Sequence, residues 1–153
     1  MIGQSDRATV VHMTTTPTTA TATTVLSESE ADAFVAEWME AWNSHDLDRI
    51  LEHYADDVDY FSPFIAALAE PGGPGADGHL AGKGPVGGYF AAALARNPDL
   101  HFDPPVPVAV GAGSVSFVYT SLGDRTAVET LVFAPGSRLV ARAHCHYRSP
   151  AGG

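Results

Sequence analysis

Basic residues, cysteine and long apolar runs are all scarce in this sequence. It has 8 Lys and Arg against 18 Asp and Glu, a formal net charge of -10 over 153 residues. Without clustered positive charge there is no surface for nucleic acid or anionic lipid, so we exclude both as partners. The single cysteine, Cys145, cannot form an internal disulfide. No run of about 18 apolar residues could span a bilayer, and no apolar secretory segment opens the chain, so we expect a cytoplasmic protein.

The length and the 45% content of hydrophobic residues suit one folded domain. Residues 1–26 are rich in Thr and Ala and poor in large apolar side chains, so we expect a disordered tail there. We place the domain at residues 27–148 and a second disordered tail at 149–153.

Three helices are predicted in the first part of this domain. Ser27 and Glu30 form a capping-box pattern, and an apolar face with helical spacing follows it. Asp46 is a suitable cap for a second helix, whose apolar positions run from Leu47 to Tyr54. A third helix is expected from Pro85 onward. The face of the first helix consists of Ala31, Phe34, Val35, Trp38 and Trp42.

Strand patterns dominate the rest of the domain. A first short strand is predicted at 58–62, and four more follow the helices, at 100–110, 114–121, 126–133 and 138–148. Residues 71–84, rich in Gly and Pro, predict a long loop that is either a lid or a surface excursion. Helices followed by an antiparallel meander indicate an α+β fold, with the helices covering one face of a curved sheet.

The last two strands carry most of the candidate chemistry. Alternation puts Arg142, His144 and His146 on one face of the last strand, and the neighbouring strand offers a lone acid, Glu129, among apolar residues. A turn that set Phe133 opposite residue 138 or 139 would bring Glu129 near 142–144. A carboxylate beside an imidazole would favour a general base. The alternative is a solvated sheet face or dimer rim, and two His without a third ligand do not indicate a metal site.

The segment from Trp42 to Pro63 is followed by Gly82-Lys83, Tyr89-Phe90 and residues 143–147. Together they resemble the SnoaL-like branch of the nuclear transport factor 2 superfamily, which includes ketosteroid isomerases and polyketide cyclases. The resemblance covers residues 28–148. It implies a cone in which three helices cover a curved, mostly antiparallel sheet and enclose an apolar pocket. It also implies no cofactor, and a homodimer formed through the outer face of the sheet.

The ketosteroid isomerase site is only partly retained. Ser62 stands where that family has its catalytic base, and Trp38 matches its oxyanion-hole tyrosine. Glu129 falls on the acid that the apolar site keeps protonated. Tyr54 matches a supporting tyrosine, whereas Phe90 replaces a second one. The chain is therefore not expected to be a true ketosteroid isomerase.

The resemblance also implies that the polar group on the last two strands lines the pocket. We expect a cofactor-independent acid/base enzyme of cyclase, isomerase or dehydratase type, acting on a hydrophobic, carbonyl-bearing molecule such as a polyketide-like compound. His146 or His144 would be the base and Glu129 its partner. Two alternatives are a non-catalytic binding protein and a dimeric scaffold with a collapsed pocket. Substrate contacts are expected from Trp38, Trp42, Tyr54, Ser62, Phe90 and Arg142.

Overall fold

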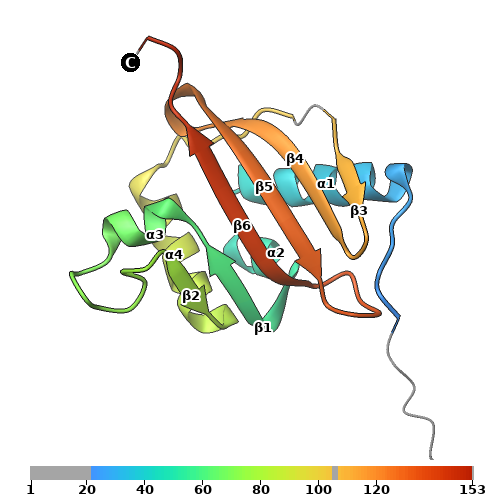
Figure 1. Cartoon of the computed structure of the whole chain (residues 1–153). Helices are drawn as coiled ribbons and strands as arrows, with labels where there is room; N and C mark the ends of the chain where they lie inside the picture. The colour runs from blue at the N-terminus through green and yellow to red at the C-terminus, as the bar shows by residue number, and fades with distance from the viewer. Residues whose placement is uncertain (1–21, 105–106, 153) are drawn as a thin grey trace, which may run out of the picture.

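A computed structural model describes residues 22–104 and 107–152, so most of the tail expected at 1–26 lies outside the described residues (Figure 1). These residues form a single six-stranded sheet, four α-helices and one 3-10 helix. In chain order the elements are α1 (Glu28–Asn43), α2 (Leu47–Leu51), β1 (Tyr54–Phe61), α3 (Pro63–Leu68), β2 (His79–Ala81), α4 (Lys83–Arg96), β3 (Ala109–Gly111), β4 (Ser114–Ser121), η1 (Leu122–Asp124), β5 (Arg125–Phe133) and β6 (Val140–Arg148).

The strands are ordered β2-β1-β6-β5-β4-β3 across the sheet. Only β1 and β6 run parallel, and every other neighbouring pair is antiparallel. Helix α1 lies behind β4, β5 and β6 in the view of Figure 1. The α+β class, with a curved and mostly antiparallel sheet, is therefore confirmed.

The first two helices begin where their caps predict. Ser27 Oγ accepts from the Glu30 N–H (3.2 Å), and Glu30 Oε2 accepts from the Ser27 N–H (2.9 Å), which completes the capping box. Asp46 Oδ1 accepts from the Arg49 N–H (3.1 Å). These side chains satisfy N–H groups that a helix leaves without a partner in its first turn.

Two elements that precede α4 were not predicted, and neither was the short η1 that follows β4. Helix α3 follows Ser62, whose side chain accepts from the Phe64 N–H, and Pro63 occupies its first position. Because of α3, the described chain has four α-helices rather than three. Strand β2 falls inside the loop expected at 71–84 and pairs with β1. Three residues paired to an edge give too short a pattern to detect in sequence.

Other boundaries also shift. Tyr54 opens β1 instead of ending the second helix, because its backbone pairs with Val140 of β6. Of the strand expected at 100–110, only residues 109 and 110 are in a ladder, as the first two residues of β3. Asp103 forms an isolated bridge with Thr120, and residues 105–106 lie outside the described part. Helix α4 begins at Lys83, two residues before Pro85.

Packed structure begins earlier than Ser27. The Thr24 hydroxyl lies 2.7 Å from the Ser137 carbonyl, to which it donates. Leu26 is buried in the core. Beyond β6, residues 149–152 are exposed. None of the helices in the described part of the chain is both long and apolar enough to cross a membrane.

Candidate active site

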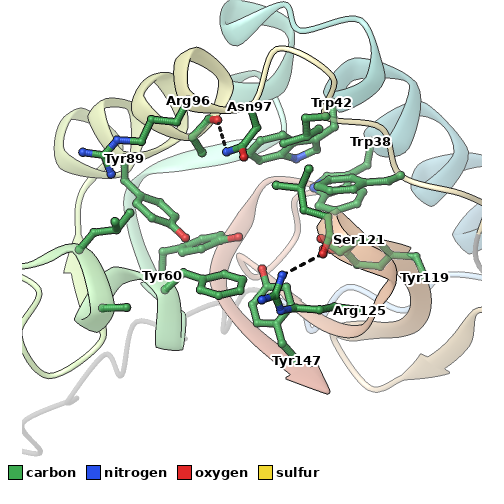
Figure 2. A pocket seen from close by; sticks show the side chains of 17 residues that line it. Trp38, Trp42, Tyr60, Tyr89, Arg96, Asn97, Tyr119, Ser121, Arg125 and Tyr147 are labelled. Atoms are coloured by element: carbon green, nitrogen blue, oxygen red, sulfur yellow. Dashed lines mark hydrogen bonds between the residues drawn. The ribbon is translucent and has the colours of Figure 1, made fainter. Parts of the chain in front are cut away.

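A cavity of about 320 Å³ lies between the helices and the inner face of the sheet (Figure 2). Eight of its seventeen lining residues are aromatic: Trp38 and Trp42 come from α1, and tyrosines come from β1, α4, β4 and β6. The lining residues are Trp38, Trp42, Tyr60, Phe64, Ala67, Leu68, Tyr89, Ala93, Arg96, Asn97, Leu100, Phe102, Tyr119, Ser121, Leu122, Arg125 and Tyr147.

A buried carboxyl group lies directly behind this wall. Glu129 on β5 is 0% exposed. The Tyr60 hydroxyl donates to its Oε1 (3.3 Å), and the Tyr119 hydroxyl donates to its Oε2 (3.2 Å). Both tyrosines line the cavity, so their hydroxyl groups connect Glu129 to the place where a ligand would lie.

The pairing of β5 with β6 explains the third partner of Glu129. Directly opposed residues of an antiparallel pair share a face of the sheet, and Glu129 is opposite Cys145. The Cys145 Sγ lies 3.0 Å from Glu129 Oε1 and 2.9 Å from the Tyr60 hydroxyl oxygen. A thiol carries one proton, so it can donate to only one of these two oxygens at a time.

Burial raises the pKa of Glu129 to about 7, and the hydrogen bonds from Cys145, Tyr119 and Tyr60 offset only part of this effect. Glu129 therefore exchanges between neutral and ionised forms at ordinary pH. When ionised, it accepts from both tyrosines. When neutral, its own O–H can donate to a tyrosine oxygen, which frees that tyrosine's hydrogen to point into the cavity.

The groups around Glu129 stay protonated. Burial is the main cause that raises the pKa of both Tyr60 and Tyr119 well above 10, with the neighbouring Glu129 charge acting in the same direction. Burial likewise raises the pKa of the Cys145 thiol. Because a thiol is reactive mainly as the thiolate, Cys145 serves as a buried donor and not as a nucleophile.

The two tryptophans expected at the site do line the cavity. The Trp38 indole N–H, however, donates to the Tyr54 hydroxyl (2.9 Å), and both residues are buried. This bond removes Trp38 from the role of oxyanion donor. The Trp42 Nε1 is buried without a hydrogen-bond partner among the described residues. Tyr54 supports the wall from behind, as does Phe90, whose ring packs edge-on against Trp42.

Three other expected site residues lie on the outer face of the sheet, away from the cavity. Arg142 and His146 are exposed and His144 is half-buried, all on the outer face. The inner face of β6 carries Cys145 and Tyr147 instead. The expectation that the histidines and Arg142 line the pocket is thus wrong, because the apolar positions of the strand face the core and the polar positions face out.

The outer-face residues make a separate polar and aromatic cluster. Phe61 stacks on His144 (4.5 Å between ring centroids) and on His79 (4.3 Å). Asp59 pairs with His79 at 2.8 Å and with Arg142 at 3.8 Å. Burial is the main cause that lowers the pKa of His144, followed by the charge of Arg142. Within 22–104 and 107–152, no three His, Cys, Asp or Glu side chains group as metal ligands.

Two further expectations concern the approach to the cavity. Ser62 is buried and caps α3, and its hydroxyl lies 3.5 Å from that of Tyr89, but Ser62 does not line the cavity. The loop at 71–84 contributes no lining residue. Helix α3 contributes Phe64, Ala67 and Leu68. The segment that borders the cavity is therefore α3, and not the loop that was considered as a lid.

The main site residues that sequence reasoning missed are Tyr60, Tyr119, Tyr147 and Arg125. Alternation did carry a signal for them. Arg125 has the same parity as Glu129 on one strand, and Tyr119 has the same parity as the buried Phe117 on another. Tyr147 has the parity of Cys145.

Comparison with known proteins supports the fold. No relative was found among proteins whose functions have been curated. The chain is similar to a SnoaL-like protein of unknown function from Burkholderia thailandensis, with 40% identity and a TM-score of 0.74 over 82% of this chain and 100% of that one. It also resembles a candidate ketosteroid isomerase from Kribbella flavida (15% identity, TM-score 0.59, 82% and 83% covered). A protein with a cystatin-like fold from Methylobium petroleophilum is 15% identical (TM-score 0.62, 84% and 82% covered).

The last two likenesses concern the fold alone. The family assignment rests on the sequence, because the sequence model of the SnoaL-like domain family matches residues 35–153, well over half of the chain. This fold is shared by isomerases and cyclases, so the family leaves the reaction open. By this match the chain belongs to the family of SnoaL-like domains.

Proposed function

We propose that the chain is a cofactor-independent acid/base enzyme acting on a hydrophobic small molecule that bears a carbonyl group. The observation that carries the proposal is the Glu129 carboxyl, buried and bonded to the hydroxyls of Tyr60 and Tyr119 in the cavity wall. A buried acid with a pKa of about 7 can both release and accept a proton at neutral pH. The two tyrosines are the groups that touch the substrate, and Glu129 acts through them.

The arrangement supports a proton shuttle. One tyrosine oxygen takes a proton from the carbon next to the substrate carbonyl, while the proton of that tyrosine passes to ionised Glu129. The C–H electrons form the enolate, and Glu129 becomes neutral. The hydroxyl of the other tyrosine then turns from Glu129 to the enolate oxygen and stabilises its charge. In an isomerisation the proton then returns to another carbon of the enolate. In an aldol closure the enolate carbon instead forms a bond to a second carbonyl carbon, and the proton passes from Glu129 through the tyrosine to the alkoxide oxygen that results.

The wall of the cavity narrows the substrate class. Its aromatic rings include Trp38, which stacks on Phe102 with 14° between the ring planes. Such a wall favours a flat, apolar body, because stacking adds to the hydrophobic gain of burial. A polyketide-like ketone has this shape, and a cavity of about 320 Å³ is in the size range of pockets that bind small organic molecules.

Proton transfer can be tested without the natural substrate. Deuterium exchange of the α-protons of 2-tetralone and related aryl ketones in D2O would be followed by NMR. We expect the wild-type protein to exchange the α-protons faster than buffer alone does. In Glu129→Gln and Tyr119→Phe, the exchange rate above that of buffer should be at least about 100-fold smaller. Arg142→Gln, on the outer face, is the control and should retain it. Wild-type exchange at the buffer rate, with the ketone shown to be bound, would reject the enzyme.

A binding protein without chemistry is the second candidate. It is favoured by one observation: among the described residues that line the cavity, none is a carboxylate or an imidazole. In this case Tyr60 and Tyr119 would only orient a ligand. Saturable binding of the ketones, with no exchange in any variant, would support it.

The outer face of the sheet also supports a homodimer, as the family resemblance implies. This face presents Val118, which is 40% exposed, together with the half-buried Val128 and Thr130. A charged residue at position 118 would have to be buried in such an interface. Val118→Asp should therefore shift the protein from dimer to monomer in sedimentation velocity, and a monomeric wild type would reject the dimer.

A further inference from the structure

The charge of the cavity wall is opposite to that of the chain. Although Asp and Glu outnumber Lys and Arg by 18 to 8, the charged side chains among the cavity's lining residues are both arginines, Arg96 and Arg125. Arg96 is exposed at the end of α4, whereas Arg125 is half-buried at the start of β5. In Figure 2 the Arg125 guanidinium lies beside Tyr147 at the lower edge of the cavity.

The turn before β5 holds Arg125 in this position. Its Nη1 donates to the Leu122 carbonyl (3.1 Å), and its guanidinium lies over the ring of Phe64, 5.6 Å from the centroid. The turn has positive φ at Gly123 (65°) and at Asp124 (56°). A Cβ at Gly123 would lie 3.0 Å from Arg125 Nη1, so the glycine leaves the room that the guanidinium occupies.

Among the described arginines that have no carboxylate partner, Arg125 is half-buried, whereas Arg96 and Arg148 are exposed. Arg138 pairs with Glu30 (2.6 Å), and Arg49 pairs with Glu37 (2.8 Å). No carboxylate in the described part of the chain lies within 4.0 Å of the Arg125 guanidinium. One of its five N–H groups donates to Leu122, and the other four donate to no described residue.

We propose that Arg125 binds a carboxylate of the substrate. The ligand is then an apolar molecule with two polar groups: the carboxylate at Arg125 and the reacting carbonyl group, which reaches the hydroxyls of Tyr60 and Tyr119. This inference rests on the proposed function, because it uses the same cavity. Guanidinium matches carboxylate in a planar, two-point geometry. An anion also stabilises a half-buried cation that has no partner more strongly than it stabilises a fully solvated cation. Stacking on Phe64 keeps the group in place and so reduces the entropy cost of binding.

Tryptophan fluorescence can report whether a ligand occupies the cavity. Both tryptophans of the chain, Trp38 and Trp42, line the cavity. Their fluorescence can therefore follow titrations of 4-phenylbutyrate and its neutral methyl ester, at pH 7.5 and low salt. We expect the acid to bind at least about 10-fold more tightly than the ester, as one charged hydrogen-bonded contact implies.

Matched variants separate the local contact from the general field. Arg125→Gln should weaken binding of the acid about 10-fold and leave the ester within twofold, and retained ester binding will show that the variant is folded. Arg125→Lys should recover only part of the loss, because lysine lacks the planar fork. Arg142→Gln removes the same charge from the outer face and should change neither affinity.

Each result bears on a different claim. Equal affinities for acid and ester, unchanged by Arg125→Gln, would overturn the carboxylate inference while leaving the cavity as a binding site. An equal loss of acid binding in Arg125→Gln and Arg142→Gln would also overturn it, since net charge alone would then explain the preference. Failure of the wild type to bind either compound would reject the inference, and with it the proposed ligand cavity.

Discussion

The hydroxyl of Tyr119 lies 3.2 Å from Oε2 of Glu129, and this bond joins the wall of the cavity to a carboxyl group that has no contact with solvent. No cationic side chain in 22–104 or 107–152 pairs with Glu129: its hydrogen bonds come from two phenols and a thiol. Neutral donors stabilise an ionised carboxylate less than an arginine would. The cost of desolvation therefore exceeds their effect, and the pKa of Glu129 is raised to about 7.

The free energy of unfolding should fall as the pH rises above 4.5, the pKa of a solvated glutamate. The pKa of Glu129 is about 7 in the folded protein against 4.5 for a solvated glutamate. Between these values the folded state binds more protons than the unfolded state, so stability is greatest below pH 4.5, declines up to about pH 7 and is then constant for this group. The difference amounts to about 3 kcal/mol.

Glu129→Gln should remove this contribution. The free energy of unfolding is measured in urea at pH 5 and pH 8. From pH 5 to pH 8, the stability of the variant relative to the wild type is expected to rise by up to about 3 kcal/mol. Glu70→Gln, at an exposed position, is the matched control and should keep the wild-type dependence. If the wild type and Glu129→Gln lost stability in parallel from pH 5 to pH 8, Glu129 would not be the group that titrates.

Removing one donor should move this titration further. Tyr119→Phe leaves Oε2 of Glu129 without its hydrogen bond, so the ionised form loses support and the pKa of Glu129 rises above its wild-type value. The variant should lose about 1 to 2 kcal/mol of stability at pH 8 and less at pH 5, where neutral Glu129 depends less on that donor. Urea midpoints at several pH values measure the shift. An equal loss at both pH values would show that Tyr119 serves packing alone.

Local pattern predicted the fold well where the signal was contained in one segment. The capping box at Ser27 and the Asp46 cap placed two helix starts correctly, because each depends on residues a few positions apart. Helix α3 and strand β2 were missed because both are short, and β2 gains its structure from pairing with β1. Tyr54 was put in a helix although a partner strand far along the chain, at Val140, determines its conformation.

The site was predicted less well, and the reason lies in β6. Its two faces differ in polarity, with Ala143 and Cys145 on one side and His144 and His146 on the other. Burial favours the apolar side, and this rule alone places the histidines outside. The family resemblance implies the reverse orientation, which the structure contradicts. Glu129 stands out in the sequence as an acid among apolar residues of the same parity, and it is buried beside the cavity wall.

Neither outer histidine should matter for the cavity, and only His144 should matter for stability. His144 stacks on Phe61 with 3° between the rings, so His144→Ala is expected to cost about 1 kcal/mol. His146 is exposed, and His146→Ala should be neutral within about 0.5 kcal/mol. Binding of 4-phenylbutyrate and exchange of 2-tetralone should stay within twofold in both variants. A large loss of exchange with either variant would return the catalytic role to the outer face.

Two glycines should respond to alanine in opposite directions. Gly88 lies on the exposed side of α4, and a Cβ there would meet nothing within 4 Å. Because alanine favours the helix over glycine, Gly88→Ala should stabilise the protein by about 0.5 to 1 kcal/mol. It also serves as the control for the same change in the turn before β5.

Gly123→Ala should destabilise the protein and weaken the binding of 4-phenylbutyrate. Its φ of 65° costs an L residue about 1 to 2 kcal/mol, and the new methyl would press against Arg125 Nη1. The guanidinium would then leave Leu122 and Phe64, and the preference for acid over ester should shrink. Urea unfolding and the fluorescence titrations measure both effects. A variant that lost stability but kept the full preference would show that the turn does not position Arg125.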